Sequence, residues 1–302
     1  MKKIRSTLVL MSAMIAVFAA FIFSEKSTFA TIDSGDTSKT LFEQLKSEVA
    51  GVSDGAVIDL PAGEYVFTEE ISISGKKISF RNNGQVSFKR APSYKGNMIK
   101  IAEDGGLTID SPDNGLIFDA ENKESNGSFI YTNGKLVING GSFKNDYNDQ
   151  ISGSGPIKAE KPGASIIFNA GIVENNNYMR NAAYSSGGFY LGDGAEMEMN
   201  GGTIRKNQGT TYDYPATPTG FWSDSPGGGA VFVANGAKFT MNGGDILENK
   251  GWGGGVFVGS ASPYDYDRTT TDPNSLKTQK KATAVFNGGS IKNNKGIGGG
   301  VR

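Results

Sequence analysis

The side chains that most resemble a chemical site are aspartates in closely spaced pairs: Asp110/Asp113, Asp146/Asp149 and Asp265/Asp267. Paired carboxylates can bind Ca²⁺ or exchange protons with a substrate, but each pair also suits a solvated turn. The chain contains no histidine and no cysteine, which removes the commonest general base and the commonest metal ligands. Catalytic residues are therefore unknown from the sequence. We expect no metal and no cofactor, with Ca²⁺ left open at the last pair.

Aromatic side chains recur at one position of a short apolar motif, where they can bind a ligand rather than transform it. In Val231-Phe232-Val233 the central side chain points away from its neighbours, because successive side chains of a strand face opposite sides. Two interpretations stay open. The aromatic column is either an exposed binding face or, as we favour, a satellite core covered by the inserted segments 208–226 and 259–281. The candidate ligand-binding residues are Tyr190, Phe232, Phe257, Trp222, Trp252, Tyr264 and Tyr266.

These residues belong to a repeat that is marked by Asn-Gly-Gly and by a second asparagine further on, as in Asn242 and Asn249. Glycine supplies the positive φ angles of a tight corner. Asparagine can bond the backbone of that corner and the asparagine of the next repeat. We therefore expect buried, structural columns without a catalytic role. The predicted ladder comprises Asn139, Asn169, Asn200, Asn242, Asn287, Asn176, Asn207, Asn249 and Asn294, with Asp146 replacing one asparagine.

The repeat predicts how the strands must return. The segment from Val231 to Val256 holds three short strands and no apolar period of about 3.6 residues. Without a crossover helix, each strand must lie beside its equivalent in the next repeat, in parallel. The predicted fold is all-β: a right-handed parallel β-helix, a solenoid of about seven rungs of three short strands.

The two ends of the exported chain differ from the repeat. Thr40-Leu41-Phe42-Glu43 is a capping box, and Leu41, Leu45 and Val49 follow on one helical face, so a short N-terminal helix is expected to cap the coil. We place this segment at residues 31–56 and the β-helix at residues 57–302. The final residues, Gly298–Arg302, begin another strand without a cap, so we expect the C-terminal end to be incomplete.

Residues 1–30 have the pattern of a signal peptide. Lys2, Lys3 and Arg5 precede an uncharged apolar run from Ser6 to Phe23, and Thr28-Phe29-Ala30 ends the segment with small residues where signal peptidase cleaves. The alternative is an uncleaved anchor, because the apolar run is nearly long enough to span a membrane. We expect cleavage after Ala30 and a secreted or cell-wall location of the Gram-positive type.

Several stretches resemble a known superfamily. The stretch from Ala56 to Tyr65 resembles the N-terminal entry of pectate-lyase-like right-handed parallel β-helix proteins. Gly-Gly-Gly-Val-Phe-Val and Phe-x-Met-Asn-Gly-Gly resemble repeats of Gram-positive cell-surface, adhesin-like members, and Gly228–Val231 resembles those of chlamydial polymorphic outer-membrane adhesins. The resemblance covers residues 40–302. It implies the fold more than an activity, because this superfold carries lyases, hydrolases and adhesins alike.

The enzyme patterns of the superfamily are incomplete in this chain. Polygalacturonase-like members use Gly-His-Gly, which a chain without histidine lacks, and no arginine stands in the Arg-x-Pro-x-x-Arg context of pectate lyases. We therefore expect a monomeric adhesion or binding module whose partner is a polysaccharide or a host or cell-surface protein. A polysaccharide lyase or glycoside hydrolase and an architectural stalk stay open as alternatives. The net charge of −1 gives no case for nucleic acid, or for a membrane after signal cleavage.

Overall fold

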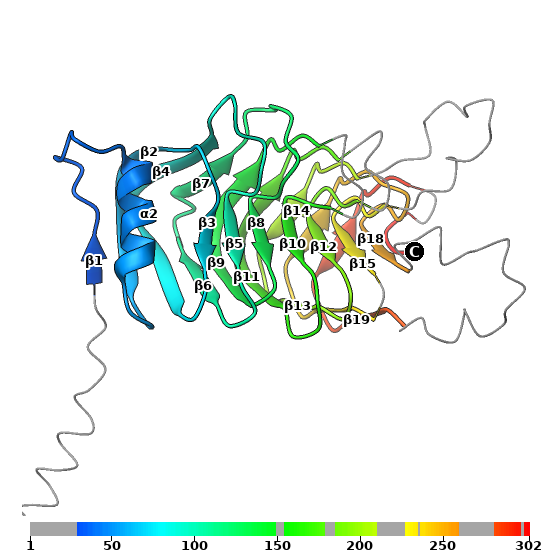
Figure 1. Ribbon diagram of the computed structural model, residues 1–302. Coiled ribbons are helices and arrows are strands. Elements are labelled where there is room, and N and C mark those ends of the chain that lie inside the picture. The colour runs from blue at the N-terminus through cyan, green and yellow to red at the C-terminus, as the bar shows by residue number, and fades with distance from the viewer. Residues whose placement is uncertain are drawn as a thin grey trace, which may run out of the picture.

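The computed structural model is all-β with one short helix and two long parallel sheets, an arrangement consistent with a solenoid (Figure 1). It describes residues 29–148, 154–178, 185–209, 227–234, 236–259, 281–296 and 299–302. Most of the predicted signal peptide lies outside these ranges. Among the described residues, no helix has the length and apolarity that a membrane span requires.

Among the described residues one sheet contains seven strands, and neighbouring strands, which are equivalents from successive repeats, pair in parallel. This pairing follows from the repeat, since no helix lies between successive strands to carry the chain elsewhere. In spatial order the strands are β3 (Ile71–Ile73), β5 (Ile99–Ile101), β8 (Ile130–Thr132), β10 (Ile157–Ala159), β12 (Phe189–Leu191), β15 (Val231–Val233) and β18 (Val256–Val258).

The other sheet contains thirteen strands and is also parallel. Its main path runs through β1 (Phe29–Thr31), β2 (Val57–Phe67), β4 (Lys77–Arg90), β6 (Gly106–Asp110), β9 (Lys135–Lys144), β11 (Ser165–Glu174), β13 (Glu196–Met199), β16 (Lys238–Met241) and β19 (Thr283–Phe286). Beside this path lie β7 (Leu116–Asp119), β14 (Thr203–Arg205), β17 (Asp245–Leu247) and β20 (Ser290–Lys292).

The helix α2 (Leu41–Gly51) lies at the β2 end of the sheets (Figure 1) and contacts β2 and β3. The predicted capping box is confirmed: Thr40 Oγ1 accepts the Glu43 N–H at 3.2 Å, and Glu43 Oε2 accepts the Thr40 N–H at 2.8 Å. Phe42, Leu45 and Val49 are its buried apolar residues, whereas the predicted Leu41 is only half-buried. The helix thus packs its apolar face against the first strands.

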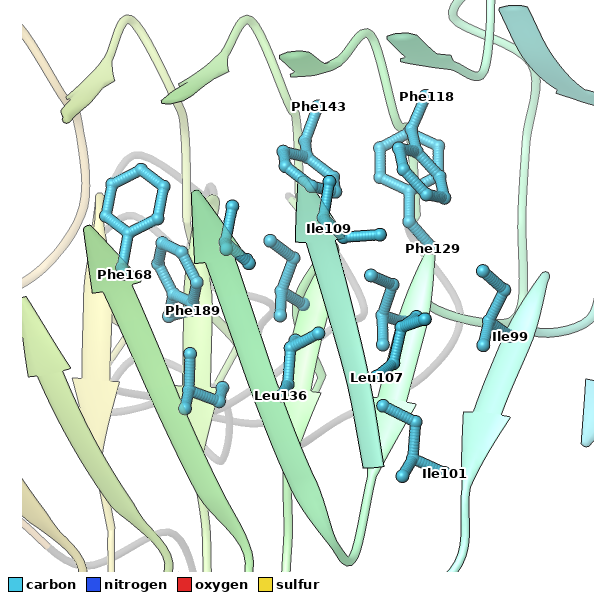
Figure 2. Packing of buried hydrophobic residues seen from close by; sticks show 14 of the residues in the cluster. Ile99, Ile101, Leu107, Ile109, Phe118, Phe129, Leu136, Phe143, Phe168 and Phe189 are labelled. Carbon is cyan, nitrogen blue, oxygen red and sulfur yellow. The ribbon is translucent and has the colours of Figure 1, made fainter. Parts of the chain in front are cut away.

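Side chains from both sheets meet in one continuous core. Figure 2 shows Phe118 and Phe143, whose stacked rings have centroids 4.7 Å apart, beside Phe129. Further along, Phe168 from β11 meets Phe189 from β12 at 5.3 Å between centroids. Phe118 and Phe143 occupy paired positions of β7 and β9, and buried apolar residues of the later strands continue the same core along the stack.

The leading asparagines of the Asn-Gly-Gly corners form a ladder at the surface, which corrects the expectation that every column is buried. The Asn242 Nδ2 donates to Asn200 Oδ1 at 2.9 Å, and the Asn287 Nδ2 donates to Asn242 Oδ1 at 2.8 Å. Asn169 and Asn139 continue the ladder. Asn169, Asn200, Asn242 and Asn287 are exposed and Asn139 is half-buried, because the glycines that follow them make the close contacts of the corner.

The second column is the buried ladder, as expected. Asn176 and Asn207 are 1 % exposed and Asn249 is fully buried. Each side chain bonds the next repeat and a backbone carbonyl: the Asn207 Nδ2 donates to Asn249 Oδ1 at 3.0 Å and to the Val173 carbonyl at 2.8 Å. Asn294 continues this ladder in the next repeat. These bonds satisfy backbone groups that a buried turn would otherwise leave unpaired.

Candidate functional site

The outward face of the seven-stranded sheet carries one column of side chains, one from the middle of each strand. Because the strands pair in register, each side chain lies beside its equivalent on the next strand. Ile130 and Val231, at the flanking positions, are buried in the main core, so the column faces the opposite side. In chain order the column consists of Ser72, Lys100, Tyr131, Lys158, Tyr190, Phe232 and Phe257.

The aromatic end of this column is a separate buried cluster. Phe232 is fully buried, while Tyr190 and Phe257 are 5 % and 8 % exposed. The ring centroid of Phe232 lies 5.6 Å from that of Tyr190 and 5.0 Å from that of Phe257. Trp252 packs against the cluster half-buried, and the Arg302 guanidinium lies 4.9 Å from its ring. These rings therefore form a small buried cluster that is separate from the main core.

Three of the candidate ligand-binding residues, Trp222, Tyr264 and Tyr266, lie outside the described residues, as do most of the inserted segments that carry them. The contribution of those segments to the cluster therefore stays a prediction. For Tyr190, Phe232 and Phe257, a ring that is nearly closed off by its neighbours has little surface to offer a ligand. A ligand that binds to this face can contact only the partly exposed residues of the column.

That part is polar and is centred on Tyr131. The Tyr131 hydroxyl donates to Glu160 Oε2 at 3.2 Å, and the Lys158 ammonium lies 3.0 Å from the same oxygen. The Lys158 nitrogen also lies between two rings, 5.4 Å from the centroid of Tyr131 and 5.3 Å from that of Tyr190. Lys158 and Glu160 side chains are 18 % and 30 % exposed. The buried aromatic cluster thus supports one side of a half-exposed Tyr-Lys-Glu group.

Electrostatics keeps the Tyr131 hydroxyl of this group protonated. Burial raises the pKa of the Tyr131 hydroxyl, and the nearby Glu160 carboxylate raises it further. Burial also raises the pKa of Tyr190, again with a contribution from Glu160. A phenol with a raised pKa stays protonated at neutral pH, so Tyr131 offers a hydrogen bond and a ring face rather than a base.

The sequence analysis did not select Tyr131, Lys158 and Glu160. The repeat itself is the sequence signal for the strand positions of this column. Ile130-Tyr131-Thr132 and Ile157-Lys158-Ala159 pair in register with Phe189-Tyr190-Leu191, but the lysine breaks the aromatic pattern and the earlier strands lack the Gly-Gly-Gly that marks the later ones. Extending the column along the sheet, residue by residue, identifies Tyr131 and Lys158, whereas Glu160 lies just after β10, outside the column, and is found only from its contacts.

A second polar cluster is closed to solvent and surrounds Asp146, which replaces an asparagine in the buried ladder. Its carboxylate accepts from the Arg90 guanidinium and the Ser125 hydroxyl, both at 2.9 Å, and from the Tyr178 hydroxyl at 2.6 Å. Burial and the adjacent carboxylate raise the pKa of Tyr178 well above its ordinary value. Arg90 and Asp146 side chains are 5 % and 0 % exposed, so a substrate cannot reach them. We interpret the cluster as the structural end of the ladder.

The aspartate pairs do not assemble into a metal site where they can be examined. Among the residues that the structure describes, no group of three or more acidic side chains is placed to hold a metal ion. Asp113 instead closes a turn, accepting the Gly115 N–H at 2.9 Å and bonding Asn82. Asp149, Asp265 and Asp267 lie outside the described residues, so the open question of Ca²⁺ at the last pair is untested.

Comparison with known protein families, curated proteins and solved structures found no match. The relation to known proteins therefore depends on the architecture. Most of the described chain is parallel β-sheet, with equivalent strands of successive repeats side by side. This architecture is compatible with a β-helix, the fold that the resemblance of the repeats implies.

Proposed function

We propose that this chain is a right-handed parallel β-helix of the extracellular or cell-surface type, and that it acts by binding rather than by turnover. The observation that carries the proposal is the outward column of the seven-stranded sheet, which passes from a buried aromatic cluster into the half-exposed group of Tyr131, Lys158 and Glu160. The N-terminal pattern of a signal peptide supports an exported location. The preferred partner is a polysaccharide or a surface protein.

The position of the group on a sheet favours binding. β8 and β10 are each paired on both sides by parallel strands, and their inward side chains are buried in the main core. The backbone under Tyr131 and Lys158 therefore loses little freedom when a ligand arrives, which lowers the entropic cost of association. Tyrosine adds a large rigid face with a polar tip, the kind of side chain that dominates binding surfaces.

Binding can be tested with the secreted chain on a printed array of polysaccharides and cell-surface proteins. We expect retention on at least one class of ligand. The double variant Tyr131→Ala/Lys158→Ala should lose that signal, whereas Val137→Ala, a half-buried outward position of β9 in the other sheet, should keep it. Melting curves of both variants check that they fold.

Two results would replace this proposal. Release of unsaturated sugars, seen as ultraviolet absorbance when the chain is incubated with uronate polymers, would identify a lyase. An array without any retained ligand would favour an architectural stalk. Retention that the double variant leaves unchanged would move the binding surface away from this face.

A further inference from the structure

We infer that the Tyr131 group is a subsite for an uncharged sugar ring, so that the ligand is a neutral glycan rather than a uronate or sulfated one. This inference rests on the proposed function and specifies its ligand class. The inference follows from three properties of the group: an aromatic face, balanced charges, and the presence of both hydrogen-bond donors and hydrogen-bond acceptors.

The aromatic face belongs to Tyr131, the half-buried ring of the column. On one side along the column it has the aliphatic stem and ammonium of Lys158, and on the other side Lys100. Parallel strands are about 4.8 Å apart, so both lysines extend from positions next to Tyr131, and the Lys158 nitrogen lies 5.4 Å from its ring centroid. A sugar on Tyr131 can therefore meet the Lys158 ammonium through its hydroxyl and ring oxygens.

Charge balance distinguishes a neutral sugar from an acidic one. Two carboxylates accompany the two lysines: Glu160 contacts Lys158 at 3.0 Å, and Glu70 bonds Asn97 and also Ser72, which is the register neighbour of Lys100. Burial, Glu160 and Glu70 all raise the pKa of the Tyr131 hydroxyl, so both carboxylates act on this residue. Because these carboxylates balance the two positive charges, a ligand carboxylate or sulfate would gain no net attraction to offset its loss of water, whereas a neutral ring needs none.

Hydrogen-bonding capacity completes the subsite. The contacts of Glu160 with Tyr131 and Lys158 both go to Oε2, and its Oε1, like other carboxylate oxygens, can accept from the hydroxyl groups of a sugar. The Asn133 side chain contacts the Tyr131 hydroxyl, yet its Oδ1 is buried without a hydrogen-bond donor among the residues the structure describes. An unmet buried acceptor carries a free-energy cost. Asn133 is itself half-buried, so a small rotation toward a sugar hydroxyl would relieve that cost.

Isothermal titration calorimetry of the secreted chain tests the inference with two probe classes: neutral cellohexaose and mannohexaose, and acidic hexagalacturonate. We expect at least one neutral probe to bind and the acidic probe to bind at least 10-fold more weakly. Tyr131→Ala should weaken neutral binding 10-fold or more, and Tyr131→Phe, which keeps the ring, should weaken it less. Val137→Ala is the matched control on the other sheet and should bind as the parent chain does.

A charge variant sharpens the test. Glu160→Gln keeps the side-chain shape and removes one negative charge, so it should weaken neutral binding modestly and improve binding of hexagalacturonate. Hexagalacturonate bound as tightly as the neutral probes by the parent chain, or neutral binding unchanged in Tyr131→Ala, would overturn the subsite and leave a binding module intact. No affinity for these probes together with an empty array would overturn the proposed function as well.

Discussion

Asn207 and Asn200 occupy the same repeat but belong to different ladders, and this difference predicts very different costs of substitution. Asn207 is 1 % exposed, and its side chain makes four bonds. Its Oδ1 accepts the backbone N–H of Asn176 at 3.1 Å, and its Nδ2 donates to the Val173 carbonyl at 2.8 Å. Asn200 is exposed and bonds the neighbouring leading asparagines.

The magnitude follows from the groups left unpaired. In Asn207→Ala the buried N–H of Asn176 loses its acceptor and the Val173 carbonyl loses its side-chain donor. Each unmet buried group costs about 1–3 kcal/mol, so we expect a loss of about 4 kcal/mol in the free energy of unfolding. In Asn200→Ala water replaces the lost bonds, and we expect a loss of less than about 1 kcal/mol.

Urea denaturation of the chain, followed by fluorescence and by circular dichroism, measures both values. A solenoid can unfold in parts, so coincident transitions by the two probes are required before free energies are compared. Equal losses in Asn207→Ala and Asn200→Ala would refute the distinction between a buried and an exposed ladder. A larger loss in Asn200→Ala would place the two columns the other way round.

The remaining predictions concern the satellite cluster, the backbone of the corner and the mature N-terminus. Phe232→Ala should lower the free energy of unfolding by about 3–5 kcal/mol, the usual cost of deleting a buried Phe ring; a loss under about 0.5 kcal/mol in urea denaturation would show an exposed ring. Glu248→Asn should raise the free energy of unfolding by about 0.5–1 kcal/mol. Glu248 has a φ of 56° at the position that Asn175 and Asn293 occupy in other repeats, and asparagine tolerates this left-handed region best. An unchanged urea midpoint would contradict this prediction. Mass spectrometry of the secreted chain should find Thr31 at the N-terminus, and a retained Met1 would rule out cleavage.

The sequence predicted the parallel pairing because its repeat leaves no helix to carry a strand away, and registers such as Tyr190 beside Phe232 follow from aligning the repeats. It could not assign burial to the two asparagine columns, since both stand next to turns and differ only in which side of the corner they occupy. The glycines that follow the leading asparagines were the available signal of this difference. They contact the corner of the preceding repeat through backbone atoms, so the asparagine side chains beside them can stay at the surface.

The long-range contacts were beyond sequence reasoning for a physical reason. Asp146 was recognised as a substitution in the ladder, but its partner Arg90 comes from the irregular strand β4, where no repeat fixes the register. The Tyr131 group depends in the same way on Glu160, which lies just after β10 and reaches the hydroxyl of the preceding strand. Side chains that lie beyond a regular strand are positioned by tertiary packing. The two-residue alternation of a strand cannot predict their positions.

A crystal structure of the chain with an oligosaccharide that it retains is the most direct test of the proposed binding face. We predict a sugar ring stacked on Tyr131, with hydroxyl groups bonded to Glu160 and Lys158 and with the Phe232 cluster unchanged. A ligand bound on the outward face of the thirteen-stranded sheet, or at the closed cluster of Arg90 and Asp146, would contradict it.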